Sequence, residues 1–219
     1  MTQSATENRQ ITLASRPMGA PTQQNFETKI TPVPVAQKDE MLLRTVYLSL
    51  DPYMRGRMND AESYAEPVEI DETMVGGAVC RVEASNIEGF DKGDWVVAFS
   101  GWQDYAISDG KEVIKLPKNF MHPSYALGVL GMPGMTAYMG LLDIGQPKAG
   151  ETVVVAAATG AVGSLVGQIA KLKGCRVVGI AGGEEKCRYA VDELGFDACL
   201  DHKSEALADS LKEVCPQGI

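Results

Sequence analysis

A glycine-rich turn between a buried strand and an amphipathic helix constrains this chain more than any other feature of its sequence. Residues 152–157 form a short continuous apolar run, typical of a parallel strand that is buried on both faces. The turn A-T-G-A-V-G at 158–163 follows, and over 161–173 apolar residues recur with helical spacing. The sequence therefore predicts a strand–turn–helix unit of an α/β domain.

The turn is similar to the dinucleotide-binding pattern G-x-G-x-x-G, with alanine in place of the first glycine. Gly160 has no Cβ, so the backbone can approach a pyrophosphate, and the following amides start a helix, where anions bind. The alternative interpretation is a tight turn in another kind of α/β protein. The flanking strands and helices favour the nucleotide site.

Strands and helices alternate through the rest of this segment, as in βαβ units. We predict strands over 152–157, 175–180 and 198–200, and helices over 161–173, 184–194 and 204–214. Gly163, Gly167 and Ala170 form a small-residue stripe on the first helix, which allows that helix to lie close to the sheet.

Before about residue 123, proline and glycine recur and the apolar runs are brief, which indicates short strands. Three strands are predicted, over 42–50, 74–83 and 94–100, and a small barrel would accommodate them. The predicted fold class is α/β with a β-rich domain. It consists of a barrel-like domain over 1–125 and the first half of a Rossmann domain over 126–219.

Charge and composition exclude several classes of protein. The chain has 20 Lys and Arg residues against 29 Asp and Glu residues, so its net charge of −9 gives no attraction for nucleic acid or an anionic membrane surface. Two uncharged stretches, 125–142 and 153–170, contain too much glycine or proline for a membrane helix. The five cysteines include no C-x-x-C pair, and residues 1–10 lack a signal peptide's apolar segment, so we expect a cytoplasmic protein.

The residues after the second predicted strand indicate which dinucleotide would bind. An NAD site needs an acidic residue about 20 residues after the glycines, to bind the ribose 2′-hydroxyl. This chain instead has Ala181, Gly182 and Gly183, followed shortly by Lys186, which can pair with a 2′-phosphate. NADP is therefore favoured over NAD. The alternative is that Lys186 is an ordinary solvated residue of the next helix.

Several longer motifs resemble one family. They are D-P-Y-M-R-G-R-M at 51–58, M-P-G-M-T-A-Y at 132–138, G-A-V-G-S at 160–164 and L-G-F-D at 194–197. With them, the chain resembles over its whole length the zinc-independent medium-chain dehydrogenase/reductases of the leukotriene dehydrogenase, prostaglandin reductase and curcumin reductase type.

The resemblance implies a GroES-like catalytic domain, a Rossmann domain and an active site between them. It also implies NADPH-dependent reduction of a carbon–carbon double bond conjugated to a carbonyl. Hydride goes to the β-carbon, the enolate oxygen is stabilised, and the α-carbon is then protonated. Alternatives are a quinone reductase or a non-catalytic NADPH- or quinone-binding module of the same fold. A third is a structural protein whose Rossmann half serves only in packing.

The resemblance also assigns site residues. Those expected to bind the cofactor are Gly160, Ala161, Val162 and Gly163 at the pyrophosphate, Lys186 at the 2′-phosphate, His202 near the adenosine phosphate and Thr136 at the nicotinamide. Many family members have tyrosine at the position of His202. A neutral imidazole can still donate a hydrogen bond there, but its contribution would vary with pH.

Tyr53 is the expected catalytic residue, able to donate to a carbonyl or enolate oxygen or to assist protonation. The alternative is a strand-end tyrosine that packs on the barrel. No metal site is expected, because the zinc-dependent branch has a Gly-His-Glu motif where this chain reads Gly76-Gly77-Ala78. The chain has only two histidines, His122 and His202.

The three strands predicted after residue 150 make one βαβαβ half, whereas a dinucleotide site needs two. The sequence thus suggests that the 219 residues end inside an unfinished Rossmann domain. If so, we expect this polypeptide alone to bind NADPH weakly and to turn over little. The complete protein is expected to act on a small-molecule substrate and to form a homodimer.

Overall fold

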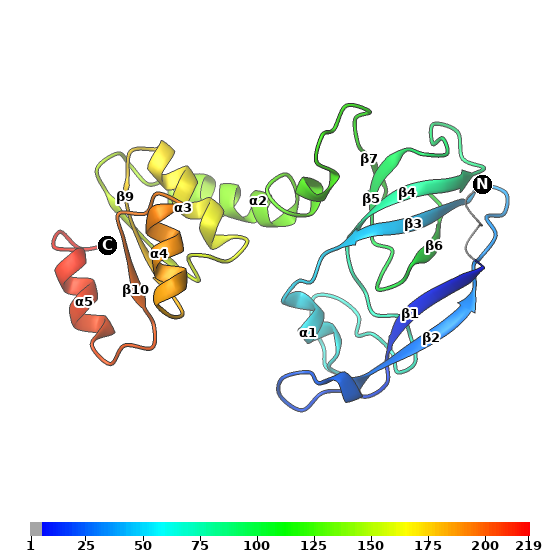
Figure 1. Ribbon diagram of the computed structural model, residues 1–219, viewed down its shortest axis with the longest axis horizontal. Coiled ribbons are helices and arrows are strands. Elements are labelled where there is room, and N and C mark those ends of the chain that lie inside the picture. Colours follow the sequence, from blue (N-terminus) through cyan, green and yellow to red (C-terminus); the bar gives the residue numbers. More distant parts are fainter. Residues whose placement is uncertain (1–5) are drawn as a thin grey trace. The chain divides into compact units, whose positions relative to one another are not determined.

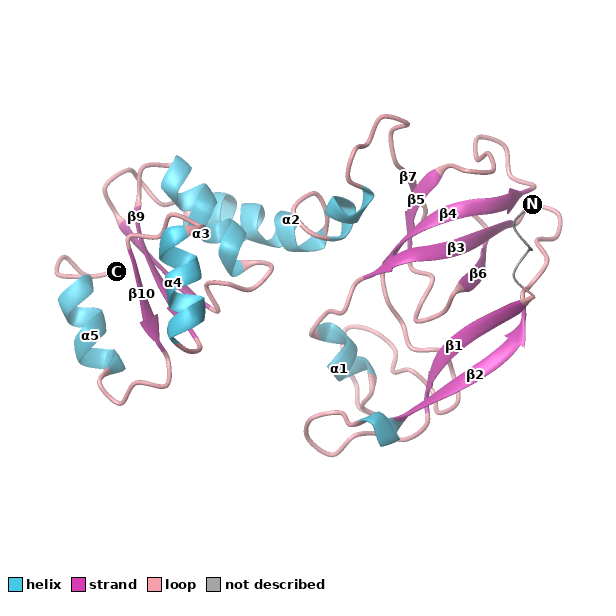
Figure 2. Ribbon diagram, in the orientation of Figure 1, coloured by secondary structure: helices cyan, strands magenta, loops and turns pink. Residues whose placement is uncertain are grey.

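The computed structural model describes residues 6–219 and separates into two compact units, Met1–Leu127 and Gly128–Ile219 (Figure 1). Strands dominate the first unit, whereas helices and strands alternate in the second (Figure 2). The prediction of a β-rich domain followed by a parallel α/β domain is confirmed.

The first unit contains two antiparallel sheets. One pairs β1 (Glu7–Leu13) with β2 (Phe26–Pro32). The other has the order β6-β3-β4-β5-β7, with β3 (Met41–Leu48), β4 (Ala78–Ser85), β5 (Trp95–Ala98), β6 (Tyr105–Ser108) and β7 (Ile114–Lys115). The helical pieces are η1 (Gln23–Asn25), α1 (Tyr53–Arg57) and η2 (Pro123–Leu127). The three predicted strands correspond to β3, β4 and β5, while the sequence did not predict the other four.

A buried polar side chain links β1 to β6. Asn8 is 2% exposed, and its Nδ2 donates to the Tyr105 carbonyl oxygen at 2.9 Å. The Tyr105 amide donates in turn to Asn8 Oδ1 at 2.8 Å. The Asn8 side chain therefore pairs with Tyr105 as a neighbouring strand would, so both of its polar groups are satisfied inside the unit.

The second unit contains a parallel sheet with the order β10-β9-β8. Its strands are β8 (Thr152–Ala156), β9 (Arg176–Ala181) and β10 (Ala198–Asp201), and its helices are α2 (Met132–Tyr138), the π-helical η3 (Met139–Gly145), α3 (Gly163–Leu172), α4 (Glu184–Asp192) and α5 (Leu207–Val214). Each predicted strand and helix after residue 150 is present, although α5 begins three residues later than expected.

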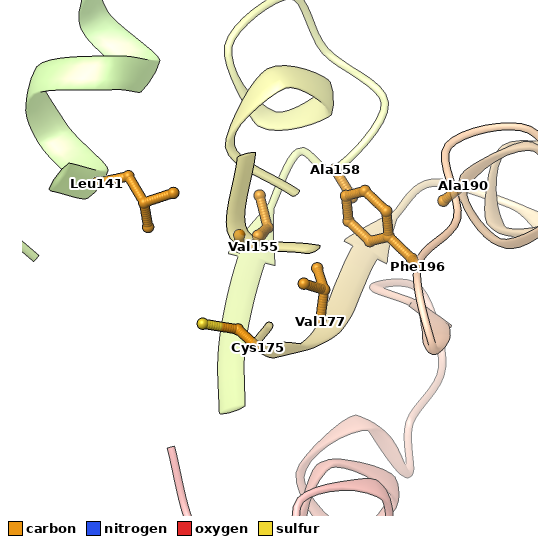
Figure 3. Packing of buried hydrophobic residues seen from close by; sticks show 8 residues of the cluster. Leu141, Val155, Ala158, Cys175, Val177, Ala190 and Phe196 are labelled. Carbon is orange, nitrogen blue, oxygen red and sulfur yellow. The ribbon is translucent and has the colours of Figure 1, made fainter. Parts of the chain in front are cut away.

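The core of this unit joins the sheet to the helices around it. Figure 3 labels the buried residues Leu141, Val155, Ala158, Cys175, Val177, Ala190 and Phe196 of this core. Gly163, Gly167 and Ala170 are the buried residues of α3, which confirms the predicted stripe. A Cβ at Gly167 would lie 2.0 Å from Phe196 Cζ, so α3 lies too close to the Phe196 ring for any side chain at that position.

Asp197 links α3 to the sheet. Its carboxylate accepts hydrogen bonds from Lys171 Nζ at 2.8 Å and from the Val177 amide at 2.6 Å. Burial alone would raise the pKa of Asp197, but these hydrogen bonds outweigh burial and hold its pKa below the usual value.

No helix within residues 6–219 has both the length and the apolar character needed to cross a membrane.

Replacing Gly167 with alanine should destabilise the second unit. Alanine normally favours a helix, but here the new methyl group would collide with Phe196, which is 3% exposed. Overpacking of this kind costs about 1–3 kcal/mol. Thermal unfolding should show a clear fall in Tm, whereas Gly140→Ala, where a Cβ would meet nothing within 4 Å, should leave Tm unchanged or higher. Equal effects of the two substitutions would contradict this packing.

The Asp197 carboxylate should make the second unit sensitive to acid. Because its folded-state pKa is lowered, its contribution to stability is complete above the ordinary aspartate pKa of about 4 and is lost as pH falls through the folded value. Asp197→Asn should lower Tm at neutral pH, and the difference from the wild type should shrink below pH ~4. Parallel Tm-against-pH curves for the two proteins would refute the assignment.

Candidate functional site

A cavity of about 500 Å³ lies at the carboxyl end of the parallel sheet. It is lined by residues at and just after the ends of β8 and β9, by Lys186 of α4 and by His202, which follows β10. Ligands of open α/β sheets bind outside the carboxyl ends of the strands. The structure thus brings together three residues predicted to bind the cofactor: Gly160, Lys186 and His202.

The turn at one side of the cavity depends on glycine at two positions, 160 and 163. Ala157 has a left-handed backbone conformation, with a φ of 49°. Its carbonyl oxygen accepts a hydrogen bond from the Gly160 amide at 2.8 Å. A Cβ at Gly163 would lie 2.3 Å from that carbonyl oxygen, against 3.1 Å for one at Gly160. The strictest need for glycine is therefore at Gly163, where α3 starts against the end of β8.

The start of α3 offers free hydrogen-bond donors. In the described part of the chain, no backbone or side-chain acceptor pairs with the amides of Ala161, Val162 and Gly163. Unpaired amides at a helix start, together with the helix dipole, bind anions such as a phosphate. These three residues adjoin Gly160 but do not line the cavity.

The other side of the cavity carries the positive charge. Gly182 and Gly183 connect β9 to α4, and a Cβ at Gly182 would lie 2.9 Å from His202 Nε2. The absence of a side chain at Gly182 therefore makes room for the imidazole. Lys186 is the one charged residue among the lining residues apart from the titratable His202, and none of them is a carboxylate. This composition suits a phosphate group.

Two predicted site residues lie elsewhere. Thr136 is exposed on α2 and does not line the cavity. Tyr53 belongs to the first unit, where it is the first residue of α1. The alternative interpretation of Tyr53 as a strand-end residue is wrong in this respect, because β3 ends at Leu48 and the chain turns through Asp51 and Pro52 into a helix.

Tyr53 lines a second cavity, of about 480 Å³, together with Arg57, Phe99 and Gln103. Burial raises the pKa of the Tyr53 phenol and nearby Asp51 raises it further, while Arg57 opposes them. The phenol therefore stays protonated at neutral pH and can donate a hydrogen bond. Tyr53 also packs, as a partly buried residue, against the cluster around Met54.

Arg57 was not predicted. It lies one helical turn after Tyr53, lines the same cavity, and has a buried Nε with no hydrogen-bond partner among the described residues. The i, i+4 spacing of a tyrosine and an arginine was the signal available in the sequence.

No group of three or more His, Cys, Asp or Glu side chains within residues 6–219 is placed to hold a metal ion.

Two family models match the chain. The model described as "N-terminal domain of oxidoreductase" matches residues 9–116, and the one described as "Zinc-binding dehydrogenase" matches residues 161–219.

Several known proteins are similar along nearly the whole chain. The NADPH-dependent curcumin reductase of Escherichia coli is 60% identical over 219 residues, which are 100% of this chain and 64% of the relative. Prostaglandin reductase 1 of Mus musculus is 47% identical over 204 residues, covering 91% of this chain and 60% of the relative. The crystal structure of CurA in complex with NADPH from Vibrio vulnificus matches with a TM-score of 0.93 and 69% identity, over 96% of this chain and 63% of that one. This chain therefore spans a little under two thirds of the length of these relatives.

Proposed function

This chain belongs to the medium-chain dehydrogenase/reductase superfamily, in the branch of curcumin reductase and prostaglandin reductase 1, and we propose that it is part of an NADPH-dependent reductase of enones and alkenals. Its relatives include proteins named NADPH-dependent curcumin reductase and 2-alkenal reductase (NADP(+)-dependent), and a similar protein was crystallised with NADPH. The observation that carries the proposal is the cavity that unites Gly160, Lys186 and His202.

The residues of the second unit fit NADPH. The unpaired amides of Ala161, Val162 and Gly163 suit the pyrophosphate. Because Gly160 has no Cβ, the pyrophosphate can approach the backbone there. Lys186 and His202 suit the 2′-phosphate, because the cavity lining contains a cation and no carboxylate to repel it. We assign Thr136 to the nicotinamide end. When bound, the cofactor supplies the hydride that is transferred to the β-carbon of the substrate.

Tyr53 has the properties of the group that would bind the substrate's carbonyl oxygen. Its phenol is a neutral donor, since its pKa is raised, and it lines a cavity that also contains the aromatic ring of Phe99. A donor at this oxygen stabilises the negative charge that develops during reduction.

The alternative function is a quinone reductase, or a module of the same fold that binds NADPH or quinone without catalysis. Three expectations stay predictions: a domain boundary near residue 125, a homodimer and a cytoplasmic location. For the reaction, loss of NADPH absorbance with an enone supports the proposal, while loss with quinones alone supports the alternative.

Lys186→Ala should weaken NADPH binding by about 10- to 100-fold, because it removes a charge-assisted hydrogen bond to the 2′-phosphate. Binding of NADH, which lacks that phosphate, should change little. Titration of the chain with each cofactor, followed by fluorescence or calorimetry, measures both.

Lys173→Ala is the matched control, since it removes the same charge from an exposed position at the end of α3. It should leave both affinities unchanged. If the wild-type chain bound NADPH no better than NADH, or if Lys186→Ala kept the wild-type preference, the 2′-phosphate assignment would be wrong.

Tyr53→Phe should lower kcat for enone reduction by about 10²-fold or more if the phenol donates to the substrate oxygen. It should barely alter Tm, because the ring and its packing are retained. Steady-state kinetics of the wild type and the variant measure kcat, and thermal unfolding of the same two proteins measures Tm. A variant with wild-type kcat would leave Tyr53 with a packing role only.

A further inference from the structure

One carboxylate oxygen connects the two loops beside the nucleotide cavity. Asp201 is the last residue of β10, and its Oδ1 accepts a hydrogen bond from the Gly183 amide at 3.0 Å. The same Oδ1 accepts from the Lys203 amide, also at 3.0 Å. Asp201 Oδ1 therefore joins the loop after β9 to the loop after β10 by two hydrogen bonds.

Both loops carry residues of the cavity. Gly183 is the N-cap of α4, and Lys186 is the third residue of that helix. His202 lies between Asp201 and Lys203, and its own amide donates to the Ala181 carbonyl oxygen at 2.9 Å. The position of the Lys186 ammonium and that of the imidazole therefore both depend on the loops that Asp201 joins.

Gly183 needs such an anchor. Its φ of 91° and ψ of 158° belong to a region that is essentially restricted to glycine, and glycine loses more conformational freedom on folding than any other residue. The hydrogen bond from its amide to Asp201 favours this one conformation over the many others open to the loop.

The charge of Asp201 makes its position notable. A carboxylate beside a phosphate site would repel the ligand, yet Asp201 does not line the cavity, and its Oδ1 is engaged by two amides. The amides of Lys203 and Gly183 lower the pKa of the Asp201 carboxyl, so it is ionised at neutral pH and remains a strong acceptor.

We propose that Asp201 is a positioning residue that sets the preference of this site for a 2′-phosphate. It fixes the loop that leads into α4, and with it Lys186, and it fixes the loop that carries His202. The proposal rests on the NADPH function proposed above. It assigns cofactor selectivity in part to a carboxylate that does not contact the phosphate.

The test compares two nucleotides, adenosine 2′,5′-bisphosphate and 5′-AMP, which differ by the 2′-phosphate alone. Calorimetric titration of Asp201→Ala should show affinity for the bisphosphate lowered by about tenfold and affinity for 5′-AMP within about twofold of the wild type. Asp201→Asn keeps an oxygen acceptor at Oδ1 and should restore most of the bisphosphate affinity.

Asp197→Ala is the matched control. Asp197 precedes β10 as Asp201 ends it, and its carboxylate also accepts a hydrogen bond from a backbone amide. That amide belongs to Val177 in β9, near the amino ends of the parallel strands and away from the cavity. This variant should unfold at a lower temperature and keep the wild-type ratio of the two affinities.

The proposal is overturned if Asp201→Ala weakens both nucleotides equally, if Asp197→Ala changes the ratio as much, or if Asp201→Asn binds no better than Asp201→Ala. A wild-type chain that binds both nucleotides equally would refute the NADPH assignment, and the role of Asp201 would fall with it. A wild-type preference that survives in Asp201→Ala would refute the role of Asp201 alone.

Discussion

The close approach of helix α3 to the sheet of the second unit requires two positions without a side chain. Gly163 lets the helix start against the Ala157 carbonyl, and Gly167 lets the Phe196 ring pack beneath it. This approach places the first amides of α3 beside the carboxyl ends of β8 and β9, where the cavity lies. Core packing and the proposed anion binding would thus share one cause, and a side chain at either glycine would disturb the packing of α3 directly.

Much of the second unit was predictable because its signals are local. A β-branched run such as 152–155 and the helical spacing in α3 each lie within a dozen residues. In the first unit, the contact between β1 and β6 joins Asn8 to Tyr105, which lies 97 residues further along the chain, and no short window contains that information. The helix that begins at Tyr53 is five residues long and includes a glycine, too little for periodicity to indicate.

The candidate site shows the same division. Gly160 and Lys186 were predicted from a turn pattern and from charge, and the fold brings them together with His202. No sequence pattern indicated the proposed role of Asp201, because that role depends on the parallel pairing of β9 with β10, which puts its carboxylate beside Gly183. Residues that act through their neighbours depend on register, and register is a property of the assembled sheet.

The pairing of Asn8 with Tyr105 has a consequence for the order of events during synthesis. The hydrogen-bonding partner of Asn8 lies 97 residues further along the chain. At about 5–20 residues per second, a ribosome needs roughly 5–20 s to make that partner. During this interval β1 can pair with β2, but its other polar edge faces solvent or any chaperone that binds it. Strand β1 is therefore synthesised early, but its hydrogen bonds to Tyr105 form late.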